Sequence, residues 1–93
     1  PILINENAPF TRRDFQIYLE RRNIQTRVVF SGNILRQPMC KNIIKKVTKE
    51  GLSNADYIMK RGVLLPLHHG MTSSMFERLH STIYDFLNEK NLA

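Results

Sequence analysis

The chain has 93 residues, of which 42% are hydrophobic, and its 14 lysines and arginines against 8 acidic residues give a net charge of +6. A chain of this length forms one small domain with a modest core and has little surface left for a deep catalytic cavity. Its single cysteine, Cys40, excludes an internal disulfide and a metal site built from several cysteines. No apolar run is long enough for a membrane span or a signal peptide, so we expect one domain, residues 1–93, in a reducing, cytoplasmic setting without membrane contact.

The first third of the chain predicts a strand, a helix and a second strand. Residues 2–5 form an apolar strand at the very start, which indicates a piece of a longer protein. Thr11 and Asp14 have the spacing of a capping box and open an amphipathic helix that ends near Asn23. Residues 24–30 are rich in β-branched side chains and predict a strand, so the helix crosses over a sheet.

The middle of the chain predicts a helix and a short strand. Ser53 and Asp56 repeat the capping-box spacing and predict a helix that ends at Gly62. Residues 62–66 predict a buried strand that a proline stops. The segment 40–51 fits either an edge strand or a helical turn, and its lysines suit an exposed edge.

The last helix carries an apolar stripe. A threonine or serine at 72–74 caps its start, with Ser74 and Glu77 in the capping-box register. Its expected core face consists of Met75, Phe76, Leu79, Ile83, Phe86 and Leu87. Together these elements predict an α+β fold, a small sheet covered by helices.

Known catalytic and metal-binding patterns are missing from the sequence. The three histidines do not combine with a nucleophile and an acid into a catalytic constellation. His68 and His69 are adjacent, and adjacent histidines rarely point at one ion, so we expect a turn whose imidazoles bond to backbone or water, and no metal site. The four glycines are isolated, which excludes a phosphate-binding loop as far as sequence does.

The basic residues are spread along the chain, without a five-residue basic block, as is typical of a solvated surface. The aromatic residues, Phe30 among them, fall mainly on predicted core faces, which leaves no stacking platform for single-stranded nucleic acid. A basic nucleic-acid-binding module nevertheless remains the alternative from a different class, and an interaction domain without a ligand is a third. The nucleic-acid module would use Arg12, Arg13, Arg21, Arg22 and the lysines of the middle segment.

The most informative segment is the polar turn at the end of the second predicted strand. Gly32 and Asn33 are residue types that tolerate positive φ, so the backbone bends sharply there. Ser31, Arg36 and Gln37 add hydroxyl, guanidinium and amide groups that suit phosphate or sugar oxygens. The alternative is an ordinary exposed loop in which Arg36 pairs with a surface carboxylate.

Three segments of the chain, taken in order, carry a family resemblance. They are Thr26-Arg27-Val28-Val29-Phe30-Ser31-Gly32-Asn33 followed by Arg36-Gln37-Pro38, then Asn54-Ala55-Asp56-Tyr57-Ile58-Met59, then Leu65-Pro66-Leu67-His68-His69-Gly70-Met71-Thr72. Together they resemble the C-terminal domain of the DegT/DnrJ/EryC1/StrS sugar aminotransferase family. The first segment resembles in particular the 3-dehydratases that act on CDP- or GDP-linked 4-keto-6-deoxyhexoses.

The resemblance implies a fold-type I enzyme that depends on pyridoxal phosphate (PLP) or pyridoxamine phosphate (PMP). This chain is then the small C-terminal domain, and a large N-terminal domain of the same protein holds the cofactor. In the family's aminotransferases a lysine of the large domain forms the Schiff base, whereas in the 3-dehydratases a histidine takes that place and PMP drives loss of the C3 hydroxyl. Members are typically homodimers, and we expect this chain alone to be inactive and free of cofactor.

The resemblance also implies roles for individual residues. Ser31, Asn33, Arg36 and Gln37 help to shape the nucleotide-sugar pocket, with Asn33 bonding to hydroxyls and Arg36 to phosphate or a neighbouring chain. His68 matches a position that the family often keeps as histidine. The leading hypothesis is a 3-dehydratase of deoxysugar and lipopolysaccharide or O-antigen synthesis, and the alternative within the family is a sugar aminotransferase.

Overall fold

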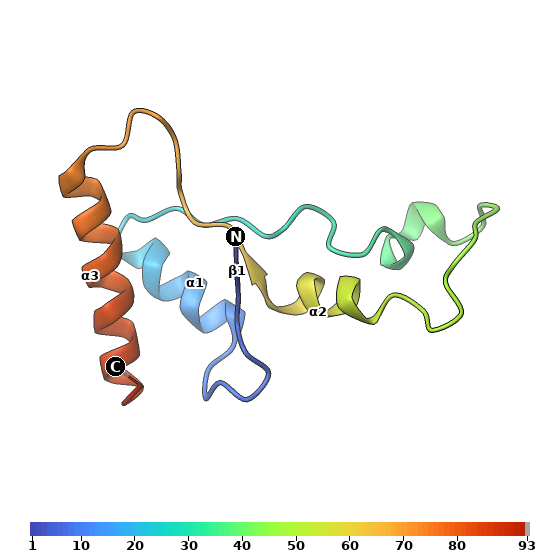
Figure 1. Ribbon diagram of the computed structural model, residues 1–93, viewed down its shortest axis with the longest axis horizontal. Coiled ribbons are helices and arrows are strands. Elements are labelled where there is room, and N and C mark those ends of the chain that lie inside the picture. The colour runs from blue at the N-terminus through green and yellow to red at the C-terminus, as the bar shows by residue number, and fades with distance from the viewer. Residues whose placement is uncertain (93) are drawn as a thin grey trace.

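Antiparallel pairing between the start of the chain and its middle organises the fold. The structure is a computed structural model that describes residues 1–92. In it, β1 (Ile2–Leu3) pairs with β2 (Gly62–Val63) so that Ile2 lies opposite Val63. The two strands form the centre of the molecule, with α1 and α3 on one side and α2 on the other (Figure 1). The α+β fold class is therefore confirmed.

The second predicted strand, residues 24–30, is reduced to one bridge. Arg27 and Leu64 exchange two backbone hydrogen bonds, of 3.1 and 2.7 Å, in antiparallel geometry. β1 and the Arg27 segment are both antiparallel to residues 62–64, so they run parallel to each other. The helix of residues 12–21 connects them, as the predicted strand-helix-strand order requires. The predicted strand lengths are wrong, since Phe30 takes a φ of +47° and ends the extended conformation.

Helix α1 (Arg12–Arg21) has the predicted N-terminus. The backbone amide of Asp14 donates to the Thr11 hydroxyl at 3.1 Å, and the amide of Thr11 donates to the Asp14 carboxylate at 2.9 Å, which completes the capping box. The helix is followed by Asn23 with a φ of 60°, the left-handed conformation expected of a residue just past a helix end.

Helix α2 (Ser53–Arg61) begins without the predicted capping box. Its N-cap is Leu52, which has no side chain able to accept a hydrogen bond. The carboxylate of Asp56 is already bound by a guanidinium and an amide from another part of the chain. Gly62 ends the helix as predicted and continues directly into β2.

Helix α3 (Ser73–Glu89) is capped by Thr72, whose hydroxyl accepts from the amide of Met75. The alternative capping register at Ser74 is wrong. Met75 and Phe76 lie half exposed rather than in the core, because the first turn of the helix extends past its neighbour α1 (Figure 1). Of the helices in residues 1–92, none has the length and apolar character needed to cross a membrane.

An aromatic cluster centred on Phe86 joins the helices of the body. The ring of Phe86 lies edge-on to Phe10, Phe15 and Tyr18, with ring centroids 4.7 to 5.3 Å apart. Edge-to-face contacts at these distances are favourable beyond the area that they bury. The buried apolar core is completed by Ile4, Phe15, Leu19, Ile24, Val63 and Phe86.

Polar contacts fix the segment after α1 against the helix. The amide and the hydroxyl of Thr26 both donate to the Glu20 carboxylate, at 2.9 and 3.1 Å. Gln16 donates to the Thr26 hydroxyl at 3.1 Å from one turn earlier. These bonds place Arg27 opposite Leu64 and so determine where the chain leaves the body.

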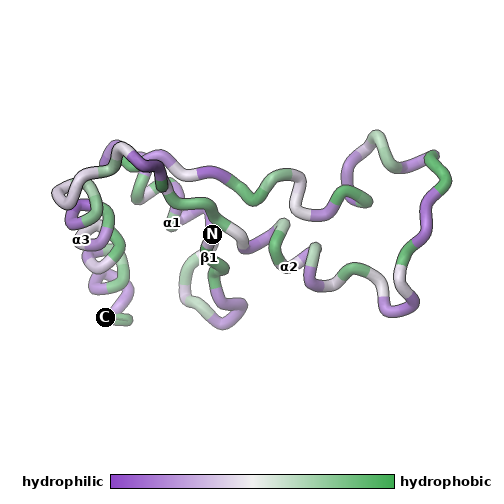
Figure 2. The backbone as a smooth tube through the Cα atoms, turned by 45° about the horizontal axis from the view of Figure 1, so that its top comes forward, coloured by the Kyte–Doolittle hydropathy of each residue, from purple (hydrophilic) through white to green (hydrophobic). Residues whose placement is uncertain are grey.

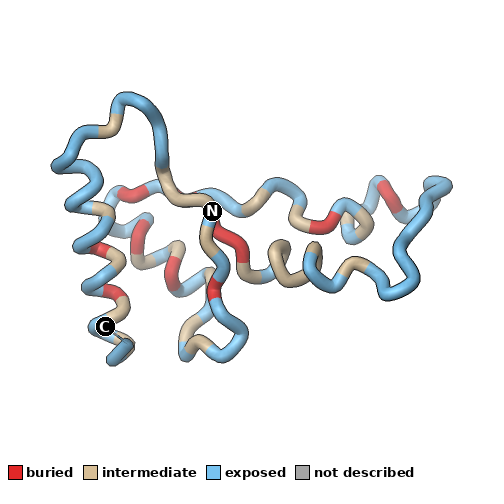
Figure 3. Tube along the Cα trace, in the orientation of Figure 1, coloured by how far each residue is buried: buried red, intermediate tan, exposed pale blue. Residues whose placement is uncertain are grey.

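Residues 28–61 form an arm that projects from the body on the side away from α3 (Figure 1). The outgoing half contains two short 3₁₀ turns, η1 (Ile34–Arg36) and η2 (Pro38–Cys40), and the return is α2. Of residues 28–61, all described by the structure, only Asn33 and Cys40 are buried (Figure 3). The radius of gyration is 16.2 Å, against about 12 Å for a compact domain of this length.

The arm exposes apolar side chains along its length, and hydrophobic and hydrophilic stretches alternate along it (Figure 2). Exposed apolar side chains that gather on one part of a protein are typical of surfaces that another body covers. We call the following exposed residues the arm row: Val28, Ile34, Met39, Ile43, Ile44 and Val47. Four lysines at the arm's apex lie among them, namely Lys41, Lys45, Lys46 and Lys49.

The two capping-box sequences give a matched test of the fold. We expect Thr11→Ala to lower the free energy of unfolding by about 1 kcal/mol, because the first turn of α1 loses its cap. Ser53→Ala removes the hydroxyl at the corresponding place in the second capping-box sequence, where no cap bond exists, and should change stability by less than about 0.5 kcal/mol. Urea unfolding followed by circular dichroism measures both, and equal losses would contradict the assignment.

Candidate functional site

The turn after the Arg27 bridge is sharply bent. The amide of Phe30 donates to the Val28 carbonyl at 3.0 Å and the amide of Gly32 to the Val29 carbonyl at 2.9 Å. Gly32 has a φ of +71°, as its residue type predicts, whereas Asn33 is extended with a φ of −123°. The second left-handed residue is instead Phe30, which the sequence did not suggest.

Gly32 lies directly against helix α2. A Cβ at this position would be 2.4 Å from the Cβ and 2.5 Å from the Cα of Met59, which is closer than real Cβ contacts allow. The left-handed backbone adds a second reason for glycine. The turn and the returning helix therefore approach each other as closely as the backbone allows.

Asp56 on α2 joins two of the predicted site residues. Its Oδ1 accepts from the Asn33 amide and from Arg36 Nε, both at 2.9 Å, and its Oδ2 accepts from Arg36 Nη2 at 2.9 Å. The Asn33 Oδ1 in turn accepts from the Leu35 amide at 3.1 Å and caps η1. We call Asn33, Arg36 and Asp56 the Asp56 node.

The electrostatics of the node follow from these bonds. The hydrogen bonds from Arg36, followed by that from Asn33, lower the pKa of Asp56 to about 2. The same bonds raise the pKa of Arg36 above its usual value. The pair is bidentate, yet its side chains are 62% and 41% exposed, so its strength is moderated by solvent. Arg36 thus makes the expected contact with a surface carboxylate through Nε and Nη2, and its Nη1 makes no hydrogen bond within residues 1–92.

Ser31 and Gln37 lie on the outer side of the same turn. The Gln37 Nε2 donates to the Ser31 carbonyl at 3.1 Å, which closes the turn across six residues. Beside them is a hollow of about 280 Å³ lined by the turn itself, by Arg12 and by Met59. We call it the turn hollow. Arg12 is partly held there, since its Nη1 donates to the carbonyls of Met59 and Gly62.

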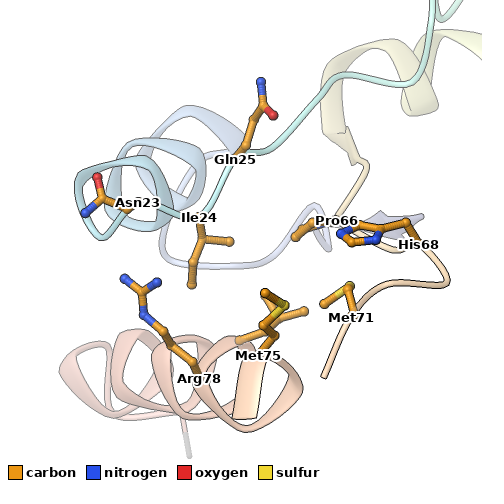
Figure 4. Close-up of a pocket in the computed structure, with 9 residues that line it drawn as sticks. Asn23, Ile24, Gln25, Pro66, His68, Met71, Met75 and Arg78 are labelled. Carbon is orange, nitrogen blue, oxygen red and sulfur yellow. The ribbon is translucent and has the colours of Figure 1, made fainter. Parts of the chain in front are cut away.

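His68 does not join this cluster. Its Nδ1 accepts from the Gly70 amide at 3.1 Å, which is the backbone-bonded turn that the sequence predicted. It lies at the edge of a different pocket, of about 220 Å³, between the 23–25 segment and the start of α3 (Figure 4). Met71 and Met75 line this pocket and Arg78 stands at its rim. Within residues 1–92 no three histidine, cysteine or acidic side chains lie close enough to hold a metal ion.

The described residues do not fit a PLP site. Such a site needs a lysine, or a residue in its place, that faces a cradle for the phosphate. Five of the chain's six lysines are exposed, and Lys90 lies over the ring of Phe86, 5.5 Å from its centroid. No chemical step through the cofactor is therefore derived from this chain.

Sequence reasoning missed two residues of this region. It assigned Asp56 to a helix cap, and the spacing of Ser53 and Asp56 gave no sign of the distant arginine. It assigned Phe30 to a core face, but the side chain is 87% exposed. The Ser-Gly pair that follows Phe30 was the available signal, because a turn starting there ends the alternation that a strand requires.

The contact between the turn and α2 predicts a large difference between two glycines. We expect Gly32→Ala to destabilise the chain by about 3 kcal/mol, because strain at positive φ adds to the collision with Met59. Gly51 also has a positive φ, +80°, but a Cβ added there would meet no atom within 4 Å, so Gly51→Ala should cost only about 1 kcal/mol. Urea unfolding and hydrogen exchange of the Leu35 amide measure the difference; equal costs would refute the close contact.

The Asp56 node predicts a pH dependence. Because the folded-state pKa of Asp56 is lowered to about 2 from about 3.9 in the unfolded chain, its contribution to stability is complete above about pH 4 and is lost as the pH falls towards 2. We expect ¹³C NMR titration of the carboxyl group to report the low value, and Arg36→Ala to move the pKa of Asp56 upwards. Arg21→Ala, a change of an exposed arginine on α1, should leave it unchanged.

Comparison with known proteins identifies the family. The model of the DegT/DnrJ/EryC1/StrS aminotransferase family matches residues 1–84. A dTDP-4-dehydro-2,6-dideoxy-D-glucose 3-dehydratase of Saccharopolyspora spinosa is 33% identical over 86 residues, which are 92% of this chain and 18% of that protein. The lipopolysaccharide biosynthesis protein RfbH of Salmonella typhimurium is 30% identical over 86 residues, 92% of this chain and 20% of that protein.

These matches place the chain within much longer relatives, since it spans about a fifth of the length of either one. The matched region includes β1, α1, the whole arm and most of α3, so it covers both the body and the Asp56 node. The family resemblance carried by the three segments is thus confirmed. The chain belongs to the DegT/DnrJ/EryC1/StrS aminotransferase family.

Proposed function

We propose that this chain is the C-terminal domain of a nucleotide-sugar 3-dehydratase, and that its arm turn shapes the site for a nucleotide-linked 4-keto-6-deoxyhexose. The observation that carries the proposal is the Asp56 node. It joins the first two segments of the family resemblance, because Asn33 and Arg36 come from one and Asp56 from the other. The name of the Saccharopolyspora relative supports 3-dehydration, and that of the Salmonella relative supports a role in lipopolysaccharide synthesis.

In this proposal the turn residues act by position. Asn33 is 3% exposed and uses both ends of its amide inside the turn, so it acts on substrate indirectly, by holding the turn in shape. Arg36 keeps Nη1 for a phosphate oxygen while Asp56 fixes the direction of its guanidinium. Ser31 and Gln37 contribute polar groups beside the turn hollow. His68 lies apart and serves its own turn.

The cofactor belongs, in the same proposal, to a large N-terminal domain of the complete protein. PLP or PMP there supplies the electron sink through which the hydroxyl at C3 is lost. The support is that the relatives are about five times as long as this chain and that the lysines of this chain do not fit the role. The fold-type I architecture and a homodimer with sites at the subunit interface are parts of the proposal.

The arm row supports the presence of such a domain. Its six apolar side chains are between 41% and fully exposed, and no element among residues 1–92 covers them. A large domain with a complementary apolar surface would bury them and place the turn beside the cofactor. The arm then serves as the part of the small domain that reaches the active site.

The structure gives less support to a nucleic-acid module. The arginines expected for it lie on α1 in the body, whereas the four lysines lie at the far end of the arm, so they share no face (Figure 1). Arg12 is held by backbone carbonyls, and the Arg22 guanidinium lies over the Tyr18 ring, 3.4 Å from its centroid. Both groups thus already make contacts within the body.

The activity of the complete protein tests the proposal. Incubated with PMP and a CDP- or GDP-linked 4-keto-6-deoxyhexose, it should release one water from the sugar, detectable by mass spectrometry. Asp56→Asn, which keeps the size of the side chain but loses its charge, should lower kcat/KM by about tenfold because the turn loses its anchor. Asp85→Asn, on the exposed side of α3, is the matched control and should have no effect.

Absorption spectra separate the candidates within the family. If PLP binds but borohydride finds no Schiff base to reduce, the 3-dehydratase is supported. If borohydride reduces a Schiff base between PLP and the protein, the aminotransferase is supported. A protein that binds no cofactor overturns both. Salt-dependent binding of nucleic acid in its place would favour the basic module.

A further inference from the structure

Phe30 occupies an unusual position for a large aromatic residue. Its φ of +47° lies in the left-handed region, which bulky residues seldom adopt, and its side chain is 87% exposed. The hydrogen bonds of the turn, from Phe30 to Val28 and from Gly32 to Val29, hold the backbone in this shape. The fold therefore holds the backbone of Phe30 so that the aromatic side chain lies in solvent, and strained residues of this kind cluster at binding sites.

The ring forms one wall of the turn hollow. Two polar groups stand near it without a partner among residues 1–92: the Ser31 hydroxyl and the Gln37 Oε1. The Ser31 carbonyl can only accept a hydrogen bond, so the side-chain nitrogen of Gln37 must face it and the side-chain oxygen Oε1 points the other way. The hollow thus offers an aromatic face, one hydroxyl and one carbonyl acceptor.

This combination selects the chemical class of the ligand. Arg12 is the one cation among the residues that line the hollow, and its Nη1 already donates to two carbonyls, whereas Arg36 is paired with Asp56 outside the hollow. A sugar needs several donors and acceptors around its hydroxyls, and the hollow has two such groups. A nucleobase presents a flat π-face for stacking and N–H groups at its edge for an acceptor such as Gln37 Oε1.

We propose that the turn hollow binds the nucleobase of the sugar nucleotide, which stacks on Phe30 while Ser31 and Gln37 contact its edge. The inference rests on the proposed function and adds a residue that determines specificity to it. It also orders the site along the turn: the base at Phe30, and the phosphates towards Arg36 Nη1, six residues further on. Phe30 is a binding residue in this scheme and takes no part in the chemistry.

Calorimetry on the complete protein tests the proposal with CDP, GDP, dTDP and ribose 5-phosphate. At least one nucleotide should bind, and ribose 5-phosphate, which lacks a base, should bind far more weakly. Phe30→Ala should weaken the tightest nucleotide about tenfold, and Phe30→Trp should retain its affinity, since stacking needs a ring rather than a particular side chain. In turnover, Phe30→Ala should raise KM and leave kcat unchanged.

Ile44→Ala is the matched control, because Ile44 belongs to the arm row, is fully exposed and lies outside the hollow. Thermal unfolding of Phe30→Ala should match that of the wild type, since the Phe30 side chain does not pack in the core. Equal weakening of nucleotide binding by both would assign Phe30 to a docking surface and overturn the proposal. Unchanged binding by Phe30→Ala in an active dehydratase would overturn this inference alone, whereas absence of cofactor binding and turnover would overturn the proposed function.

Discussion

The extended stretch from Gly62 to Leu64 is the element on which the rest of the structure depends. It pairs with β1 through Val63, which is fully buried, and with Arg27 through Leu64. A Cβ on Gly62 would lie 2.7 Å from the Ile58 carbonyl, so α2 turns into the strand without space for a side chain. Body and arm meet at these three residues, and hydrogen bonds from Arg12 and between the Ile4 amide and the Arg61 carbonyl also join them.

The arm has little stability of its own, and this property suits its proposed role. It contributes two buried residues and depends on the contact of Gly32 with Met59 and on the Asp56 node, which is partly solvated. Segments with few buried apolar contacts open locally at low free energy. Docking against a second surface would bury the arm row and order the turn at the same time, which couples formation of the site to assembly.

The two capping-box spacings show how far local sequence decided the fold. Thr11 and Asp14 form the box because nothing else competes for the Asp14 carboxylate. Ser53 and Asp56 have the same spacing and form none, since Arg36, twenty residues away, offers a charged bidentate partner that is stronger than a backbone amide. The prediction that Phe30 lies on a core face was wrong for a related reason. Periodicity assigned Phe30 to a strand, but within residues 1–92 the strand pairing of this segment ends at Arg27.

The sequence by itself determined the three helices, the cap of α1, the left-handed Asn23, the sharp turn at Gly32 and the membership of the family. These features depend on residues within a few positions of one another, or on segments that can be matched directly to relatives. Only the tertiary structure decided the partner of Asp56, the separation of His68 from the turn and the exposure of Phe30. These features depend on which distant segments of the chain meet. Which donor binds the Asp56 carboxylate, and where strand pairing stops, are decided only when the chain is folded.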